Sequence, residues 1–452
     1  MIDLIKREFN DLVSDRRFSE ILKGSVWAIS ARIFAAGVTI ITNSIVARIY
    51  GASAMGILAM ISSYLVFITI FTVLGTNTSI LRFIPEHVTK YSFASAFHIY
   101  RKILHLVAAF SVSTGIFLFF VSGIVAEDIF SKPHLTSLFA LAAVFVIFKS
   151  LMLLNTQAVR GLGLIKTFAF MQVLPHLTMI FILILTTLFF YRPHNPVYSQ
   201  LFAWCFAALA GAVIMSRFFK KQMSPTDQIE LIPVKDILKI SLPMFMTATL
   251  NLAIVQMGMI ILAMFRSESE VGYYSVAFKL ATLTTFVLQA VNSMSAPKFS
   301  SLFQRGDLAE LFYIAKKSAK LIFWTTGPVL LFLVIFGKPT LAILFGSDFL
   351  ISYPVLLILA IGQFVNSISG STALFMNMTG HEKEFRNIVL CAALINITLN
   401  ILLIPKFGMV GTALAGMSSV IFWNGYTLFY IKVKYGKTIG YFPRLSEVFS
   451  NR

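Results

Sequence analysis

Apolar residues gather in twelve runs, each long enough to cross a bilayer, which takes about 20 helical residues. Polar and charged residues collect in the short segments between the runs. The pattern therefore predicts an all-α polytopic membrane protein with twelve transmembrane helices. The runs cover residues 25–49, 54–77, 103–125, 135–159, 167–191, 197–219, 240–265, 272–296, 318–337, 352–378, 386–405 and 409–432.

The segment before the first run, residues 1–24, alternates charged residues with Ile, Leu and Phe. It has no continuous apolar core, so it is not typical of a cleavable signal peptide. We expect this segment to be an amphipathic helix that lies on the cytoplasmic surface of the membrane.

The composition agrees with a membrane protein. Of 452 residues, 58% are hydrophobic and 12% are charged, whereas a soluble protein carries about 25% charged residues. The composition therefore argues strongly against a soluble enzyme. In a soluble chain the formal net charge of +18 would suggest binding to nucleic acid. In a membrane protein its interpretation depends on which side of the membrane the basic residues lie.

Basic residues lie predominantly in the segments on one side of the predicted membrane. With both termini in the cytoplasm, 28 of the 37 Lys and Arg residues fall in inner segments and six in outer ones. Short cytoplasmic loops collect Lys and Arg, so this distribution predicts cytoplasmic termini. It also accounts for most of the net charge through topology and anionic lipid, and we expect no nucleic-acid partner.

Short strings recur between the two halves of the chain at a nearly constant offset. LKGS at 22–25 recurs as LKIS at 238–241, and Gly56 pairs with Gly272, both at an offset of 216; Gly163 and Lys166 pair with Gly380 and Lys383 at 217. We expect an N-lobe at 25–222 and a C-lobe at 235–452, each with six helices, joined by a cytoplasmic linker at 223–234. An even number of helices makes the repeats parallel. Such lobes would surround a central cleft and allow alternating-access transport.

Three basic residues lie within the predicted spans and away from their ends: Arg32, Lys149 and Lys279. No Asp or Glu lies in any predicted span, and an intramembrane charge costs about 2.5–3.5 kcal/mol on insertion scales. We interpret the three cations as a binding site for an anionic cargo such as a phosphate group. Snorkelling to the interface is the alternative for all three residues, and bonding to helix carbonyls is a further alternative for Lys149.

Polar side chains at helical spacing accompany these cations. Thr39 and Asn43 share a face with Arg32, and Thr156 shares one with Lys149; such faces contact either a cleft or a neighbouring helix. Asn366 is expected to form hydrogen bonds between helices, with the cleft as its alternative position. The remaining candidates for contact with sugar hydroxyls are Asn251, Gln256 and Gln289.

No motif indicates a catalytic, metal or cofactor site. Cys205 and Cys391 lie in apolar runs without metal-type spacing, and the chain has no phosphate-binding glycine loop and no hydrolase or metalloprotease motif. We expect a protein that is not an enzyme and that uses no cofactor or metal.

Several strings resemble a known family. RFIPEH at 82–87, AFKL at 277–280, APKFSSLFQRGDL at 296–308 and NITLNILLIPKFGMVGTALAG at 396–416 are similar to those of the Wzx-type O-antigen and polysaccharide flippases. This polysaccharide transporter family belongs to the superfamily of the MATE drug exporters and the lipid II flippase MurJ. The resemblance implies a MATE-like fold in which two lobes surround a cleft.

The resemblance also implies a cargo and a location. The cargo would be an oligosaccharide repeat unit linked to undecaprenyl pyrophosphate, moved across a bacterial inner membrane during lipopolysaccharide or related polysaccharide synthesis. Membrane lipid, a polysaccharide polymerase and a chain-length regulator are the candidate partners, and we expect a monomer. An ion-coupled multidrug exporter is the first alternative, although it requires an intramembrane carboxylate. A membrane-embedded polymerase or transferase is the second, although the predicted outer loops are short.

Overall fold

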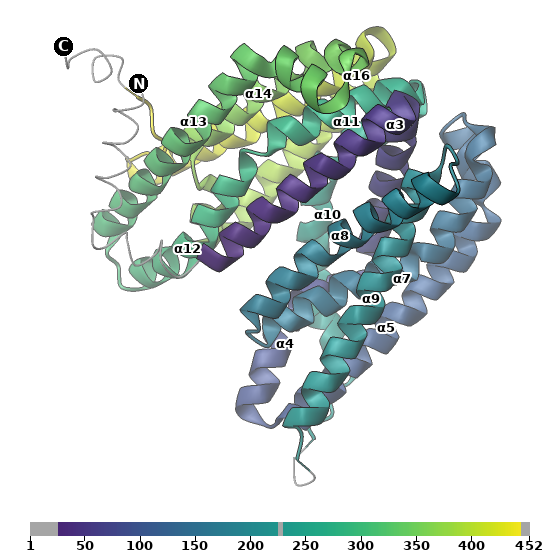
Figure 1. Cartoon of the computed structure of the whole chain (residues 1–452). Coiled ribbons are helices and arrows are strands. Elements are labelled where there is room, and N and C mark those ends of the chain that lie inside the picture. The colour runs from purple at the N-terminus through teal and green to yellow at the C-terminus, as the bar shows by residue number, and fades with distance from the viewer. Residues whose placement is uncertain (1–25, 225–228, 444–452) are drawn as a thin grey trace. The chain divides into compact units, whose positions relative to one another are not determined.

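A computed structural model describes residues 26–224 and 229–443, and in these ranges all regular secondary structure is helical, with no strand (Figure 1). The predicted all-α architecture is therefore confirmed, while the predicted helix at residues 1–24 lies outside the described residues. The elements are α3 (Val26–Val73), α4 (Thr76–Lys90), α5 (Phe93–Phe120), α6 (Ser122–Ile124), η1 (Val125–Ile129), η2 (Pro133–Leu135), α7 (Thr136–Gly161), α8 (Ile165–Phe189), α9 (Asn195–Gln222), α10 (Val234–Phe265), α11 (Glu268–Thr282), α12 (Thr285–Gln304), α13 (Leu308–Phe345), η3 (Ser347–Ser352), α14 (Tyr353–Ser369), α15 (Thr372–Met378) and α16 (Glu382–Tyr435).

The two longest helices are each interrupted by a glycine. In α3, of 48 residues, Gly51 has a φ of 79°, and in α16, of 54 residues, Gly408 has a φ of 53°. Residues with a side chain rarely adopt this left-handed region. Each glycine therefore divides its helix at the point where the sequence places the gap between two apolar runs.

Eight described helices are long and apolar enough to cross a membrane, or ten if each of two bent helix pairs counts as one span. The second of these pairs, α11 with α12, bends by 43°. The apolar runs at 135–159, 167–191 and 197–219 correspond closely to α7, α8 and α9.

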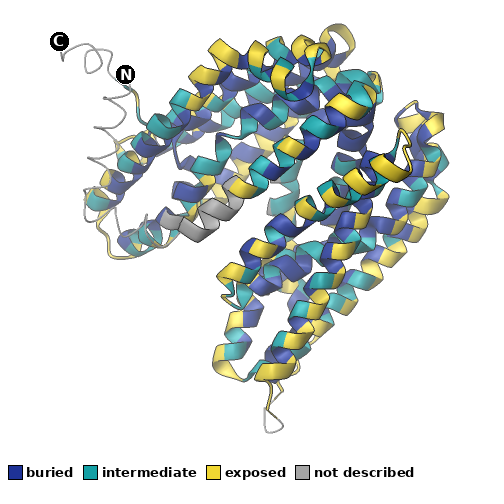
Figure 2. Cartoon of the chain, in the orientation of Figure 1, coloured by how far each residue is buried: buried dark blue, intermediate teal, exposed yellow. Residues whose placement is uncertain are grey.

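Exposed residues lie along many of the helices, drawn in yellow in Figure 2, and large apolar residues are among them. Examples are Phe120 at 80%, Phe189 at 71% and Ile343 at 70% exposure. Exposed apolar surface on this scale is unfavourable in water and favourable against lipid. The burial pattern thus agrees with a multi-pass membrane protein.

The helices form two compact units. The first comprises Ala31–Ser275, and the second contains the described residues from Val276 onward. In the first unit α5, α7 and α9 lie side by side, α8 packs against α9, and α4 packs against both α7 and α10 (Figure 1). In the second unit α14 packs between α13 and α16, and α15 packs against α12 and α16. The predicted lobes, with a boundary at residues 223–234, stay a prediction.

Helix α4 follows α3 and is amphipathic. One face is buried through Ile80, Phe83 and Ile84, whereas Arg82 and Lys90 lie exposed. Arg82 and Lys90 flank Glu86 at helical spacing and pair with its carboxylate, and these contacts lower the pKa of Glu86. The helix is too polar to appear among the apolar runs, and it carries the RFIPEH string.

Candidate functional site

Lys149 lies near the middle of α7, within the compact unit Ala31–Ser275. Its ammonium is 4.1 Å from the centre of the Trp204 indole ring, and Trp204, on α9, is itself only 5% exposed. Among the described residues Lys149 makes no hydrogen bond and no ion pair. An aromatic face attracts a cation but accepts none of its N–H donors in the usual geometry. The ammonium thus keeps its donors for another acceptor.

The neighbouring polar groups of α7 are already paired. Ser150 shares a 2.6 Å hydrogen bond with Thr72 of α3. Asn155 accepts a hydrogen bond of 2.8 Å from the Tyr100 hydroxyl and donates one of 3.1 Å to the carbonyl of Ala208. These bonds tie α7 to α3, α5 and α9, and they hold the backbone on either side of Lys149 in place.

Thr156, expected on the same face as Lys149, forms a hydrogen bond within its own helix. Its hydroxyl donates to the carbonyl of Met152 at 2.7 Å, within the same helix. Arg160, one turn further along, lies 5.5 Å from the ring of Phe168 on α8. Two cations of this face therefore contact aromatic rings of neighbouring helices, and the threonine is satisfied internally.

The predicted polar face of α3 contacts a neighbouring helix. The Thr39 hydroxyl lies 3.2 Å from Nδ1 of His176 on α8 and donates to the carbonyl of Ala35, while the Asn43 amide donates to the carbonyl of Thr39. Thr39 thus contacts a neighbouring helix, and a position of this face at the cleft stays a prediction. The side chain of Arg32 lies outside the described residues.

The other candidates are distributed over both compact units. Lys279 lies half buried on α11, in the unit that begins at Val276, so the placement of Arg32, Lys149 and Lys279 in one cleft stays a prediction. Gln256 is half buried on α10 and Gln289 is exposed on α12. The side chain of Asn251 lies outside the described residues.

Asn366 takes part in hydrogen bonds between helices of the second unit, as the sequence favoured. It accepts a hydrogen bond from Asn424 of α16 at 3.3 Å, and Asn424 in turn accepts one from Thr372 at 3.1 Å. Asn366 also lines a small cavity. The other residues that line it are Thr284, Leu288, Ile322, Thr326, Gln363 and Ser367.

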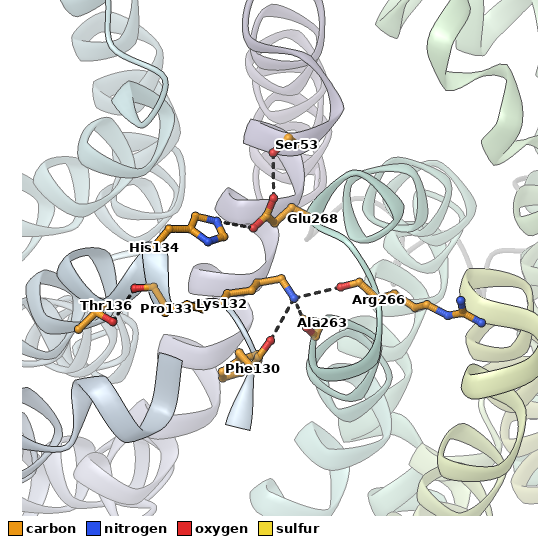
Figure 3. A network of polar contacts seen from close by, with 9 residues as sticks. All are labelled: Ser53, Phe130, Lys132, Pro133, His134, Thr136, Ala263, Arg266 and Glu268. Atoms are coloured by element: carbon orange, nitrogen blue, oxygen red, sulfur yellow. Dashed lines mark hydrogen bonds and ion pairs between the residues drawn. The ribbon is translucent and has the colours of Figure 1, made fainter. Parts of the chain in front are cut away.

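Sequence reasoning missed the network around Lys132 (Figure 3). Lys132 is 6% exposed, and its ammonium donates three hydrogen bonds to backbone carbonyls: Phe130 at 3.2 Å, Ala263 at 2.7 Å and Arg266 at 3.0 Å. Ala263 and Arg266 are at the carboxyl end of α10, where helix carbonyls lack intrahelical partners and carry partial negative charge. Burial lowers the pKa of Lys132, and the nearby Glu268 carboxylate opposes that shift.

Glu268, the first residue of α11, completes this network. Its carboxylate accepts a hydrogen bond of 3.2 Å from the Ser53 hydroxyl and lies 2.8 Å from Nε2 of His134. Figure 3 shows the three side chains converging from α3, from η2 and from the start of α11. The sequence offers no spacing signal for this network, because its members are far apart along the chain.

The backbones of α3 and α11 cross in close contact at two glycines. A Cβ at Gly56 would lie 1.7 Å from the carbonyl oxygen of Glu268, and one at Gly272 would lie 2.1 Å from that of Ala52. The contact is reciprocal, as at a two-fold axis. The same offset of 216 that pairs Gly56 with Gly272 also pairs Ala52 with Glu268.

Comparison with known proteins shows which proteins the chain is similar to. The family model described as "Polysaccharide biosynthesis protein" matches residues 45–354, more than half of the chain. The probable low-salt glycan biosynthesis flippase Agl15 of Haloferax volcanii is 30% identical over 162 residues; this match spans 35% of the chain and only 34% of that relative.

Two longer matches cover most of the chain. The uncharacterized membrane protein MJ1068 of Methanocaldococcus jannaschii is 20% identical over 409 residues, which is 87% of this chain and 80% of the relative. Among solved structures, the lipid II flippase MurJ in an inward closed conformation superposes with a TM-score of 0.74 at 16% identity, covering 90% of this chain and 87% of that one. At that identity the likeness shows the fold alone.

Proposed function

Because the chain belongs to the polysaccharide biosynthesis protein family, we propose that it is a flippase that moves a lipid-linked glycan across the membrane by alternating access. Membership agrees with the resemblance to polysaccharide flippases that the sequence motifs carry. The name of the relative Agl15 supports transport of a glycan precursor. The same matches support a transporter and not an enzyme.

The proposed architecture has twelve spans in two parallel lobes. Eight helices qualify as spans. Two of them, α3 and α16, are divided by Gly51 and Gly408 and count as two spans each. Each of the two bent helix pairs adds one further span. Counted in this way, the described chain has twelve segments that agree with the twelve apolar runs. The reciprocal contact of Gly56 with Gly272 supports a two-fold relation between the repeats.

The observation that carries the proposed binding step is the environment of Lys149. Its ammonium rests on the Trp204 ring, and the described residues provide no carboxylate or carbonyl partner. A cation held only by a neutral aromatic face offers its N–H donors to a phosphate without competition from an internal anion. We propose that Lys149 binds the phosphate of the carrier lipid, with Arg32 and Lys279 as further contacts during transfer.

The finer proposal concerns cargo and location. The cargo would be an O-antigen or similar repeat unit on undecaprenyl pyrophosphate, as the flippase resemblance implies. The 28 basic residues in inner segments against six in outer ones support cytoplasmic termini, and the flippase resemblance implies a bacterial inner membrane. A monomer acting beside a polysaccharide polymerase and a chain-length regulator completes the proposal.

Replacement of Lys149 tests the proposed binding step. We expect Lys149→Met to reduce flipping of a fluorescent lipid-linked oligosaccharide in proteoliposomes by about tenfold or more, because the charged hydrogen bonds to phosphate are lost. Folded protein is checked by its thermal unfolding in detergent. Lys221→Met, which removes an exposed lysine at the end of α9, serves as the matched control. Unimpaired flipping by Lys149→Met would exclude the role.

A further inference from the structure

The contacts between the loop at 130–136 and the corner that joins α10 to α11 suggest more than static packing. We infer that Ser53, Lys132, His134 and Glu268 form a releasable clasp, here named the outer clasp, which closes the outer side of the transporter and parts when that side opens. The inference rests on the proposed alternating-access function. It goes beyond that function by naming the contacts that must break.

Apart from the bond that Lys132 donates to the Phe130 carbonyl, each contact of the outer clasp joins the first predicted repeat to the second. Ser53 and Lys132 precede residue 222, whereas Ala263, Arg266 and Glu268 follow residue 235. The charge distribution assigns this end of the helices to the exterior. If one repeat rocks away from the other on that side, these are the hydrogen bonds that are lost.

The chemistry of Lys132 suits a contact that opens and closes. A buried apolar side chain at this position would seal the corner at lower cost, because a lysine must give up its hydration to be buried. Its three carbonyl acceptors replace that hydration when the clasp is closed. On opening, water can replace the carbonyls, so neither state leaves the charge or the end of α10 without partners.

The crossing of α3 and α11 at Gly56 and Gly272 also suits a contact that opens and closes. Gly56 and Gly272 bring the two backbones into direct contact, and neither glycine has a side chain that could interlock with the other helix. Separation of the two helices therefore exposes little apolar surface at this point. The polar side chains around the crossing, Ser53 and Glu268, supply the bond that keeps the helices together.

Access of an impermeant thiol reagent to a buried position tests the clasp. Ala263 is fully buried and its carbonyl binds Lys132. In a chain with Cys205 and Cys391 replaced by Ser, Ala263→Cys reports opening from the outer side. We expect Lys132→Met to speed labelling by an impermeant maleimide about fivefold or more. Lys338→Met, at an exposed lysine of another predicted outer segment, should leave the rate unchanged.

Glu268→Gln provides a second variant that preserves side-chain shape in case Lys132→Met does not fold. We expect it to speed labelling of the Ala263→Cys reporter by a smaller factor, because an amide holds His134 and Ser53 less strongly than a carboxylate. Unchanged labelling in every variant that folds would overturn the clasp. The assay needs no cargo, so a chain that fails to flip a glycan and a clasp that fails to open are separate results.

A cross-link gives the reverse experiment. Ser53→Cys with Glu268→Cys, joined by a short bifunctional thiosulfonate, should abolish flipping, and a reductant should restore it. Either single cysteine treated with the same reagent is the control. Flipping that continues at the uncross-linked rate would show that the contact need not break during transport, which would also overturn the inference.

Discussion

Lys132 and Lys149 lie in the same compact unit and are both largely withdrawn from water, but their surroundings are opposite. The Lys132 ammonium donates to three backbone carbonyls, two of them at the end of α10. The Lys149 ammonium faces an indole ring and donates to no described residue. One lysine has its donors saturated by the protein, and the other keeps them available.

This difference indicates two different roles. A lysine that completes the hydrogen bonding of a helix end stabilises the folded chain, and its removal leaves carbonyls without donors. A lysine that rests on an aromatic ring gains a weaker and less directional interaction, so a phosphate can take over its donors with little loss. Depth in the predicted membrane does not reveal the role of Lys132. This residue lies in an outer segment, where a lysine is expected to be exposed.

The largest expected effect that separates the two lysines is on stability. Lys132→Met should lower the free energy of unfolding by about 1–3 kcal/mol, because the buried carbonyls of Ala263 and Arg266 lose their donor. Lys149→Met should change it by less than about 1 kcal/mol, since only the ring contact is lost. Thermal and denaturant unfolding in detergent micelles measures both.

The two substitutions serve as controls for each other, because each exchanges a lysine for a flexible apolar side chain of similar length. Equal losses of stability would mean that Lys149 is also a structural residue, and the comparison would fail. A loss of stability in Lys149→Met but not in Lys132→Met would mean that Lys149 is the structural lysine and Lys132 is not.

Most of the fold could be predicted from the sequence, because membrane spans follow from uninterrupted apolar runs. The runs that predict α7, α8 and α9 differ from the observed helices by only a few residues. Helix α4 was missed since its charged residues, including Arg82 and Glu86, interrupt any apolar run. A search for spans does not detect a short helix with one buried face.

The candidate site was only partly predictable. Lys149 could be singled out because a charge inside a long apolar run is conspicuous. Lys132 could not, because a lysine in an outer segment counts only toward topology, and its acceptors Ala263 and Arg266 lie far along the chain, |i−j| being 131 and 134. The repeat alignment pairs Gly56 with Gly272, but it does not say that the paired residues touch.

A smaller effect is expected from the ring beneath Lys149. Trp204→Phe keeps an aromatic face but weakens the attraction for the ammonium, which is strongest for indole. We expect flipping to fall about two- to fivefold, and Trp204→Leu to lower it further. Trp324→Phe, at a tryptophan of the other unit that donates to Tyr441, is the matched control. If the two variants at position 204 reduce flipping equally, the aromatic ring does not position Lys149. The ring contact would then not distinguish Lys149 from Lys132.

The smallest expected effect is a pH dependence specific to Lys132. Burial holds the pKa of Lys132 in the folded chain below its ordinary value of 10.5. Between the folded and the ordinary pKa the unfolded chain binds more protons, so stability rises with pH across that window. The burial penalty is fully present below the folded pKa and has disappeared above the ordinary one. The unfolding free energy of wild type minus that of Lys132→Met should therefore increase as the pH approaches 10.5 from below, since titrating groups that do not interact with Lys132 cancel in the difference. A difference that stays flat would mean that the three carbonyls compensate the burial completely, and Lys132 would then be a saturated lysine in the strictest sense.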